Sequence, residues 1–323
     1  MGFTLRQLEV FTAVIDHGGF GAAADHLRMS QSAVSHTLAA FERATGAPLV
    51  RRSPAVAATM LGEVLLPHAR SVLAAARAME AAIETHNEKD ATGLVRVAAP
   101  PTVSHRLIPE LFALWRTEIP GVDIRLFEGS DAELEEWLAT GAVDAAVLID
   151  PDPFPAGGLL LASDDFRAVL RQDHPLAASG RIELEDLLAD PLLVTSSGCE
   201  PQIKQLHLMA GAGYAPAQRV HDVSTLLAMV EAHLGVAIMP SLAATMLPDT
   251  LTMVELEPRL GRRLVLTGPT DRPWNPHVTR MRDIAQKSTG SRARHSGGGV
   301  AGTLGDVHGL SRGEFVRQAA QAF

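Results

Sequence analysis

Residues 20–45 read FGAAADHLRMSQSAVSHTLAAFERAT, and this stretch decides the fold of the N-terminal part of the chain. Apolar residues recur three or four positions apart on both sides of Arg28, which predicts two short helices separated by a turn. Ser30 is a suitable N-cap for the second helix, and Gly46 and Pro48 end it. The alanines of the first helix permit the pair to pack closely. We therefore expect a compact helix-turn-helix.

The outer face of the second helix carries small polar side chains, as base contacts in a helix-turn-helix require. The predicted DNA-facing residues are Ser30, Gln31, Ser32, Ser35 and His36. Gln can bond adenine in two places, Ser can serve any base, and His can donate to guanine or phosphate. Arg51 and Arg52 follow the helix as predicted phosphate contacts, which position a protein without reading sequence. On spacing alone, a polar face that only meets solvent is the open alternative.

The flanking segments complete this unit. An apolar stripe from Leu5 to Ile15 predicts an additional first helix, and residues 49–58 could form a short wing. Residues 59–88 predict one long helix, whose apolar residues recur about every 3.5 positions: Leu61, Leu65, Val72, Ala76, Met79 and Ile83. A solitary helix with one apolar seam needs a partner, which favours a dimer. Packing of this helix on its own domain is the alternative.

From Gly93 onward the pattern alternates between strands and helices. The segments at 93–99, 122–129 and 143–150 predict buried strands, with helices near 105–118 and 131–140. A second set of predicted strands follows at 166–171, 191–195, 218–223 and 236–240, with helices near 200–210 and 223–234. A strand at 262–268 and a helix from about 275 close the fold. Alternating strands and helices predict a parallel sheet covered by helices on both faces. Two such subdomains joined by crossing strands would leave a cleft between them.

Composition bounds the possible functions. The 323 residues suit two or three domains, and no apolar run approaches the roughly 18 residues of a membrane span. The N-terminus has no apolar signal segment, and a single cysteine, Cys199, fits a reducing cytoplasm. The net charge of −9 does not favour a nucleic-acid binder, but residues 1–58 hold five Arg against four acidic residues. The acidity therefore lies outside the predicted DNA-binding unit.

No catalytic constellation is present in the sequence. The GxSxG, HExxH, CxxC and GxxxxGK[ST] patterns do not occur, and the scattered histidines form no metal-spaced pair with a cysteine. We expect no catalytic residue, no metal and no cofactor, and hence not an enzyme.

The DNA-binding signature of LysR-type transcriptional regulators resembles a run of residues here: Ala23-Ala24-x-x-Leu27-x-Met29-Ser30-Gln31-Ser32-Ala33-Val34-Ser35-x-x-Leu38-x-x-Phe41-Glu42. The match continues through Gly46-x-Pro48-Leu49-x-x-Arg52, and Gly62 stands where that family has a glycine entering its linker helix. Weaker matches follow in the right order at 174–177, 190–194 and 234–240. The resemblance spans about residues 4 to 288.

This resemblance implies an α/β multidomain regulator with a winged helix-turn-helix, a long linker helix and an effector domain similar to type 2 periplasmic binding proteins. The implied parts are the head at 1–58, the linker and dimerisation helix at 59–90, the effector domain at 91–288 (subdomain I about 91–162 and 267–288, subdomain II about 163–266), and a tail at 289–323 that we expect to be disordered. It also implies a homodimer or homotetramer on double-stranded promoter DNA, with RNA polymerase as a possible further partner.

Carried over by position, the effector cleft would be lined by Thr102, Ser104, Ser130, Ser196 and Ser197. Hydroxyl groups beside exposed helix N–H groups suit an anion, so a small carboxylate or oxyanion is the expected effector. The alternative for each of these residues is an ordinary helix cap.

Some residues depart from the family pattern. The segment at 53–58 lacks the basic residue that many relatives carry in the wing, and His233 stands where glycine is more usual. Cys199 occupies the position of the reactive cysteine in the peroxide-sensing branch, but Leu208 and Met209 stand where a second cysteine would be needed. The alternatives to an effector-controlled regulator are a thiol-based redox sensor acting through Cys199 and a cytoplasmic solute-binding protein with no role on DNA.

Overall fold

The structure is a computed structural model that describes residues 2–53, 55–86, 92–196 and 198–295. The N-terminal head consists of α1 (Leu5–Asp16), α2 (Phe20–Leu27) and α3 (Gln31–Thr45), followed by an antiparallel wing of β1 (Val50–Arg51) and β2 (Ala57–Ala58). Its core is closed by the inward residues of all three helices, among them Phe11, Ala23, Val34 and Leu38, each fully buried. The predicted winged helix-turn-helix is confirmed.

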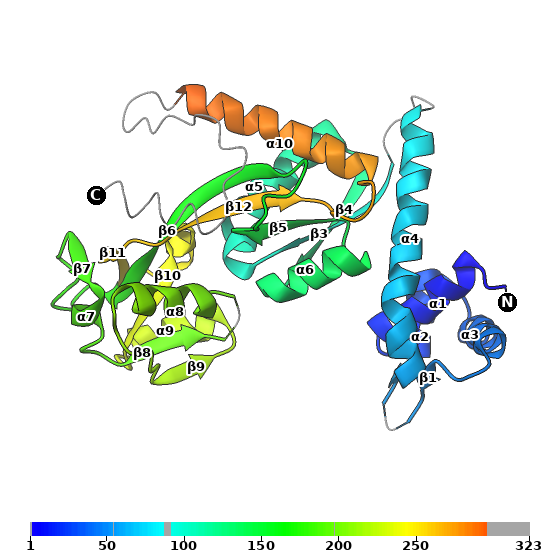
Figure 1. The fold of residues 1–323 in the computed structure, drawn as a ribbon, viewed down its shortest axis with the longest axis horizontal. Helices are drawn as coiled ribbons and strands as arrows, with labels where there is room; N and C mark the ends of the chain where they lie inside the picture. The colour runs from blue at the N-terminus through cyan, green and yellow to red at the C-terminus, as the bar shows by residue number, and fades with distance from the viewer. Residues whose placement is uncertain (1, 54, 87–91, 197, 296–323) are drawn as a thin grey trace.

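Helix α4 (Met60–His86) leaves the head and runs along the effector domain (Figure 1). Its first turns belong to the head, because Leu61 and Leu65 pack against the core of that unit. Gly62 permits this approach, since a Cβ there would lie 2.1 Å from the carbonyl oxygen of Leu49. Further along, Ala74 and Ala81 are buried against the effector domain.

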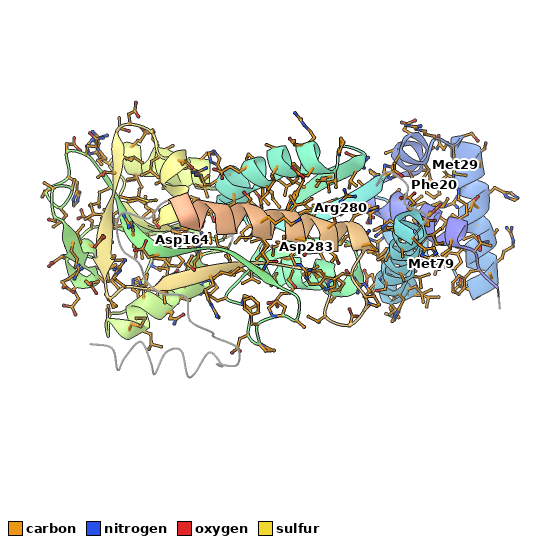
Figure 2. The ribbon with its side chains drawn as sticks, turned by 90° about the horizontal axis from the view of Figure 1, so that it is seen from above. Phe20, Met29, Met79, Asp164, Arg280 and Asp283 are labelled. Carbon is orange, nitrogen blue, oxygen red and sulfur yellow. The ribbon has the colours of Figure 1, made fainter. Side chains whose placement is uncertain are left out.

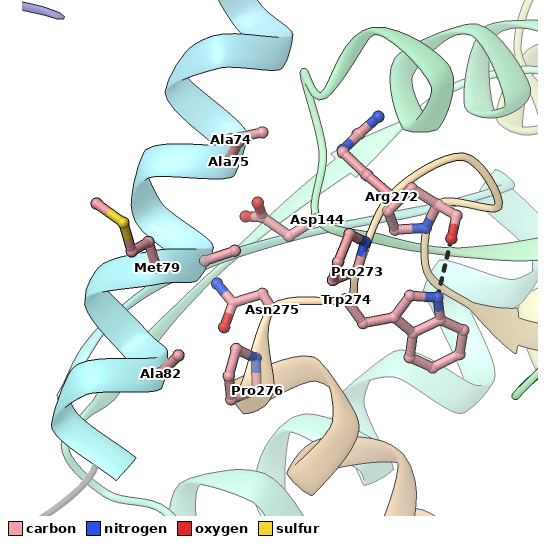
Figure 3. A pocket seen from close by; sticks show the side chains of 12 residues that line it. Ala74, Ala75, Met79, Ala82, Asp144, Arg272, Pro273, Trp274, Asn275 and Pro276 are labelled. Atoms are coloured by element: carbon pink, nitrogen blue, oxygen red, sulfur yellow. Dashed lines mark hydrogen bonds between the residues drawn. The ribbon is translucent and has the colours of Figure 1, made fainter. Parts of the chain in front are cut away.

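The contact of α4 with the effector domain uses small side chains. Figure 3 shows Ala74, Ala75 and Ala82 of α4 opposite Asp144, Asn275 and Pro276. All six residues line a cavity of about 420 Å³. Hydrogen bonds fix the edges of this contact: Ser71 donates to the carbonyl of Thr140 (3.1 Å), and Arg77 donates to the carbonyl of Gly141 (3.4 Å). The linker helix is therefore seated on the end of α6 rather than free in solvent.

Subdomain I is built on the parallel strands β3 (Gly93–Ala99), β4 (Val122–Glu128) and β5 (Ala145–Ile149), with β12 (Gly261–Thr267) antiparallel to β5. Alternate residues of β3 face opposite sides, as a strand requires. Val95 and Val97 pack against α5 (Pro101–Glu118) and α10 (Pro276–His295), while Ala98 packs against α6 (Asp131–Thr140).

Subdomain II repeats this layering. Its elements are β7 (Arg181–Glu183), α7 (Leu184–Leu187), β8 (Leu192–Thr195), α8 (Glu200–Met209), β9 (Gln218–Val220), α9 (Val223–Glu231), β10 (Val236–Pro240), the 3₁₀ helix η1 (Ser241–Met246) and β11 (Leu251–Glu257). Val236 and Ile238 face the core under α8, whereas Ala237 and Met239 face α9. Both faces of each sheet are thus covered by helices.

Two crossing strands join the subdomains, as the sequence predicts, and they pair antiparallel with each other. β6 (Leu159–Arg171) pairs with β12 through its first half and with β10 through residues 166–169. The subdomain boundary differs from the predicted one, because Leu264 to Thr267 of β12 pair with β5. Residues 264–266 therefore lie in the sheet of subdomain I.

The C-terminal helix is longer than the sequence indicates. α10 continues through residues 289–295, which the sequence analysis assigns to a disordered tail. Once a helix is nucleated, each added residue gains one backbone hydrogen bond, so continuation through a polar segment needs no apolar stripe. The rest of the predicted tail, residues 296–323, lies outside the described residues.

Candidate functional site

The recognition helix α3 begins with a well-formed cap. The Ser30 hydroxyl accepts a hydrogen bond from the backbone N–H of Ala33 (3.2 Å) and lies 3.0 Å from the hydroxyl of Ser32. The predicted DNA-facing residues lie on the outside of the helix: Ser30, Gln31, Ser32 and His36 are exposed, and Ser35 is half-buried. Because Val34, Leu38 and Phe41 are buried in the head, this outer face is the only one available to a ligand of α3.

The two arginines of the wing are both exposed but differ in their contacts. The carboxylate of Glu42 accepts hydrogen bonds from the backbone N–H groups of Leu49 (2.8 Å) and Val50 (3.2 Å), which ties the start of the wing to α3. The Arg52 guanidinium lies over the Phe20 ring, 4.9 Å from its centroid. Arg51 lies in β1 with its side chain in solvent.

Two of the predicted effector residues lie together at the first turn of α5. Thr102 and Ser104 are both buried. The Thr102 hydroxyl accepts a hydrogen bond from Nη2 of Arg262 (3.3 Å), and the Ser104 hydroxyl donates to the carbonyl of Ala99 (3.5 Å). Thr102 is therefore in contact with a cation, as an anion site would require.

The other predicted effector residues have structural contacts. Ser130 is the N-cap of α6, and the Glu133 carboxylate accepts from both its backbone N–H (2.8 Å) and its hydroxyl (2.7 Å). These hydrogen bonds lower the pKa of Glu133. The exposed Ser196 donates to the carbonyl of Val220 (3.2 Å). Ser197 lies outside the described residues.

Sequence reasoning missed a buried charge cluster where the two crossing strands pair. Arg262 has a side chain with 0% exposure and forms a two-point ion pair with Asp164, Nε to Oδ1 at 2.6 Å and Nη2 to Oδ2 at 3.1 Å. The two residues are partners in the register of β12 and β6. Nη1 of Arg262 is buried and has no hydrogen-bond partner among the described residues. A buried guanidinium N–H without an acceptor is a position that an anion can fill.

Two further buried groups come from opposite subdomains. Asp131 at the start of α6 is hydrogen-bonded to the side chain of Gln202 in α8. Oδ1 of Asp131 and Oε1 of Gln202 are buried without a donor among the residues that the structure describes. Burial raises the pKa of Asp131 to about 6, although the Gln202 hydrogen bond and Arg262 oppose this shift. Together with Arg262 these groups offer one donor and two acceptors to a ligand.

Cys199 precedes α8 and packs, half-buried, against the core of subdomain II. Burial raises the pKa of its thiol to about 11, which disfavours the reactive thiolate at neutral pH. The geometry therefore argues against the redox-sensor alternative.

One signal in the sequence could have identified Arg262. Side chains two positions apart in a strand share a face, and Leu264 and Leu266 of the same strand are buried in the core of subdomain I. A charged residue on that inward face is rarely buried without a partner. The position of a charged residue on the inward face of β12 thus distinguishes Arg262 in the sequence, but it does not identify Asp164 as its partner.

In the part of the chain that the structure describes, no three His, Cys, Asp or Glu side chains are placed to hold a metal ion. None of the described helices is long and apolar enough to span a bilayer.

Comparison with known proteins places the chain in a family. A model described as "Bacterial regulatory helix-turn-helix protein, lysR family" matches residues 5–63, and one described as "LysR substrate binding domain" matches residues 88–290. The chain belongs to the LysR family of bacterial transcriptional regulators, and is a DNA-binding regulator with an effector-binding domain.

Individual relatives agree with this assignment. The chain is 32% identical over 273 residues to the uncharacterized HTH-type transcriptional regulator YvbU of Bacillus subtilis, covering 83% of this chain and 92% of the relative. It is also 32% identical over 271 residues to a probable hydrogen peroxide-inducible genes activator of Mycobacterium avium, covering 81% and 87%. The inducing signal named here, hydrogen peroxide, is that of the Mycobacterium avium relative.

Solved structures share the fold. A full-length OxyR variant from Pseudomonas aeruginosa has a TM-score of 0.68 at 23% identity, covering 88% of this chain and 95% of that one. Full-length CbnR in complex with its target DNA has a TM-score of 0.62 at 22% identity, covering 88% and 100%. The arrangement of head, linker helix and effector domain is therefore that of full-length LysR-family regulators.

Proposed function

We propose that this regulator reads promoter DNA through the outer face of α3, with Gln31, Ser32, Ser35 and His36 toward the bases and Arg51 and Arg52 on phosphates. The observation that carries this proposal is the exposure of polar side chains on α3 beside a fully apolar inner face. Ser30 supports the helix start rather than the base contacts, since its hydroxyl already caps α3. The protein acts in the cytoplasm and catalyses no reaction.

The proposed division of labour follows the helices and strands. The head (1–58) binds DNA, the linker helix (59–90) joins two copies, and the effector domain (91–288) senses a ligand. Exposed apolar side chains on α4 support self-association: Val64 (58% exposed), Val72 (41%), Met79 (62%) and Ile83 (54%). Apolar side chains at this exposure on one helix favour burial against a second copy, giving a dimer or tetramer. RNA polymerase is a further proposed partner at the promoter.

The proposed effector is a small organic anion held between the subdomains. Nη1 of Arg262 would donate to its anionic group beside Thr102, while Asp131 and Gln202 would accept hydrogen bonds from the rest of the molecule. Because these residues come from both subdomains, a ligand that contacts all of them would favour the arrangement in which they converge. Such a ligand shifts a population only by its difference in affinity between arrangements.

The DNA-binding proposal is tested by footprinting on the DNA immediately upstream of the protein's own gene. The wild type should protect a two-fold symmetric site, and Gln31→Ala should weaken protection by roughly tenfold or more, the value of a good bidentate base contact. Gln218→Ala is the matched control, because Gln218 is also exposed but lies in β9 of subdomain II. Equal protection by the Gln31→Ala and Gln218→Ala proteins would contradict the assignment of α3.

The effector proposal is tested by thermal unfolding with a panel of small carboxylates and their uncharged amides. Carboxylates should raise the Tm of the wild type while the amides do not, because only an anion pairs with Arg262. Gln202→Ala should reduce the rise, and it keeps the Arg262–Asp164 ion pair intact. A panel in which amides and carboxylates act alike would exclude an anionic effector at this cluster.

A further inference from the structure

A second cavity, of about 520 Å³, lies where the DNA-binding head meets the effector domain. It is lined from three directions: by α1 and α2 of the head, by α4, and by β3, β4 and α6 of subdomain I. Its volume is in the range of sites for small molecules. Since the head and the effector domain both form its walls, occupancy of this cavity bears directly on how the two units sit together.

Basic side chains gather in this cavity from all three directions: His17 and His26 from the head, Arg70 and Arg77 from α4, and Arg96 and Arg125 from the effector domain. The rings of His17 and His26 lie 4.2 Å apart between centroids.

Three carboxylates line the cavity: Glu9, Asp16 and Glu80. They balance the positive charge of the arginines only in part. Glu9 pairs with Arg6 outside the cavity (2.8 Å), Asp16 pairs with Arg70 (2.5 Å), and Glu80 is exposed.

Arg77, Arg96 and Arg125 have weak partners. Arg77 reaches Asp144 only at 3.4 Å, and its Nε is buried with no partner within the described part of the chain. The guanidinium of Arg96 donates a hydrogen bond to the carbonyl of Ala142 (3.4 Å). The Asp144 carboxylate accepts a hydrogen bond from the backbone N–H of Arg96 (2.9 Å) rather than from its guanidinium. Arg125 is half exposed and meets Asp123 at 3.7 Å.

The titration of two residues reflects this excess of positive charge. Burial lowers the pKa of His26, and His17, Arg125 and Arg96 lower it further. Burial also lowers the pKa of Arg96, with Arg77 as the next cause. A nearby anion would reverse both electrostatic contributions.

Aromatic and aliphatic surface lies beside the cations. Phe127 is 40% exposed, and its ring meets Trp137 edge-on with centroids 6.5 Å apart. Leu27 and Leu73 line the same cavity. Guanidinium groups next to aromatic rings suit a ligand that combines a negative charge with a flat apolar body.

We propose that this cavity is a second ligand site, which binds a planar organic anion against Phe127 and Trp137 with its charge on Arg96 and Arg125. The site is separate from the Arg262 cluster, and the proposal does not depend on the effector site there. Because the anion would lie on Arg96 and Arg125 of the effector domain in a cavity that the head also lines, its binding stabilises the head against the effector domain. Ligand concentration is thereby coupled to the placement of the DNA-binding helices.

Arg70 and Arg77, the cations that α4 contributes to the cavity, lie away from the apolar seam of this helix. Arg70 and Val72 are two positions apart, as are Arg77 and Met79, and residues at this spacing do not face each other on a helix. Ala76 also lines the cavity and is four positions from Val72, so the cavity borders the surface proposed to meet a second copy.

Trp137 provides a local reporter, because the other two tryptophans, Trp115 and Trp274, do not line this cavity. The full-length protein is titrated with phenyl phosphate, inorganic phosphate and 2-phenylethanol while tryptophan fluorescence is recorded. Phenyl phosphate should produce a saturable change that is lost in Trp137→Phe, and both partial probes should bind at least about tenfold more weakly.

Arg125→Gln tests the charge contact, and Arg116→Gln is its matched control, an exposed arginine of α5 that does not line the cavity. Phenyl phosphate should bind about tenfold more weakly to Arg125→Gln and unchanged to Arg116→Gln. Equal binding by the two variants, no saturable change in the wild type, or inorganic phosphate or 2-phenylethanol matching phenyl phosphate would overturn the proposal.

Discussion

The recognition helix α3 and the Arg262 cluster use polar side chains under opposite conditions. On α3 the polar groups lie on the outer face, where Gln31, Ser32 and His36 are exposed to solvent, and the buried inner face holds the helix in place. At the crossing strands, Arg262 and Asp164 are almost fully removed from water, with side-chain exposures of 0% and 6%. Figure 2 shows how far apart these regions are, with Asp164 at the crossing and Phe20 and Met29 in the head.

This difference separates binding from stability. Exposed polar groups contribute little to folding, so substitutions on α3 should change DNA affinity while leaving the free energy of unfolding nearly constant. Buried charges must be compensated inside the protein, so substitutions at Arg262 or Asp164 should change both stability and ligand response.

The largest effect is expected for Asp164→Asn, which keeps the shape of the side chain but leaves Arg262 buried without a counter-charge. Breaking a buried pair in this way costs about 3–5 kcal/mol of unfolding free energy. The measurement is urea denaturation of the full chain. Asp173→Asn is the control, because Asp173 also forms an ion pair with an arginine, Arg171 (2.9 Å), but is 61% exposed. Its effect should be small, and a similar loss in both variants would show that burial does not set the value of the pair.

Asp131→Asn should stabilise the protein at neutral pH. The pKa of Asp131 is about 6 rather than 3.8, so between these values the folded state binds more protons than the unfolded state. Stability therefore falls as pH rises through this window, and the neutral amide avoids a penalty of roughly 1–3 kcal/mol at pH 7. Denaturation at pH 7 and near pH 4 should show a gain that disappears at the lower pH.

Glu133→Gln, two residues further on α6, should change stability in the opposite direction. Hydrogen bonds from Ser130 lower the pKa of Glu133, so its contribution is present above the unfolded pKa of 4.5 and is lost as pH falls. The variant should thus be less stable than the wild type at pH 7. If both carboxylates responded alike, burial of Asp131 would not explain its behaviour.

Gly62→Ala should destabilise the junction between head and linker by about 1–3 kcal/mol, the usual range for overpacking. The added Cβ would lie 2.1 Å from a backbone oxygen, which cannot rotate away as a side chain can. Gly21→Ala in α2 is the contrasting variant, since no atom lies within 4 Å of its Cβ position. Helix propensity alone should make Gly21→Ala neutral or stabilising by up to about 1 kcal/mol. Thermal unfolding and DNA affinity of the two proteins would distinguish a steric from a general effect.

The head could be predicted from the sequence because its determinants are local. The Ser30 cap, the inward Val34 and Leu38, and the turn at Arg28 act within a few residues of one another. The elements of the effector domain were predictable for the same reason, since each strand shows its own period. Crossing strands were expected between the subdomains, but the pairing of β6 with β12 joins distant segments, and no local pattern encodes that pairing.

The candidate effector site was only partly predictable. Thr102 was expected on the basis of its position, but its partner Arg262 comes from 160 residues further along the chain. His233 became interpretable only with the backbone in view: its φ of 60° ends α9 in the left-handed region, where glycine is favoured. That conformation accounts for the glycine more usual at this position, and the Asp131–Gln202 contact likewise required the folded arrangement of the two subdomains.

The smallest effects are expected for Arg51 and Arg52, of which Arg52 combines features of both regions. Arg51→Ala should remove one phosphate contact and leave the free energy of unfolding unchanged, because the Arg51 side chain is exposed to solvent. Arg52→Ala should remove a phosphate contact and also the stacking on Phe20, with a loss of about 0.5–1 kcal/mol in unfolding free energy. Both should reduce the salt dependence of DNA binding by about one unit of slope. Denaturation and salt titration of the two variants separate the stability role from the phosphate contact. If Arg51→Ala lost as much stability as Arg52→Ala, the contact of Arg52 with the Phe20 ring would contribute nothing to folding. Both arginines of the wing would then act like the exposed polar residues of α3, on DNA alone.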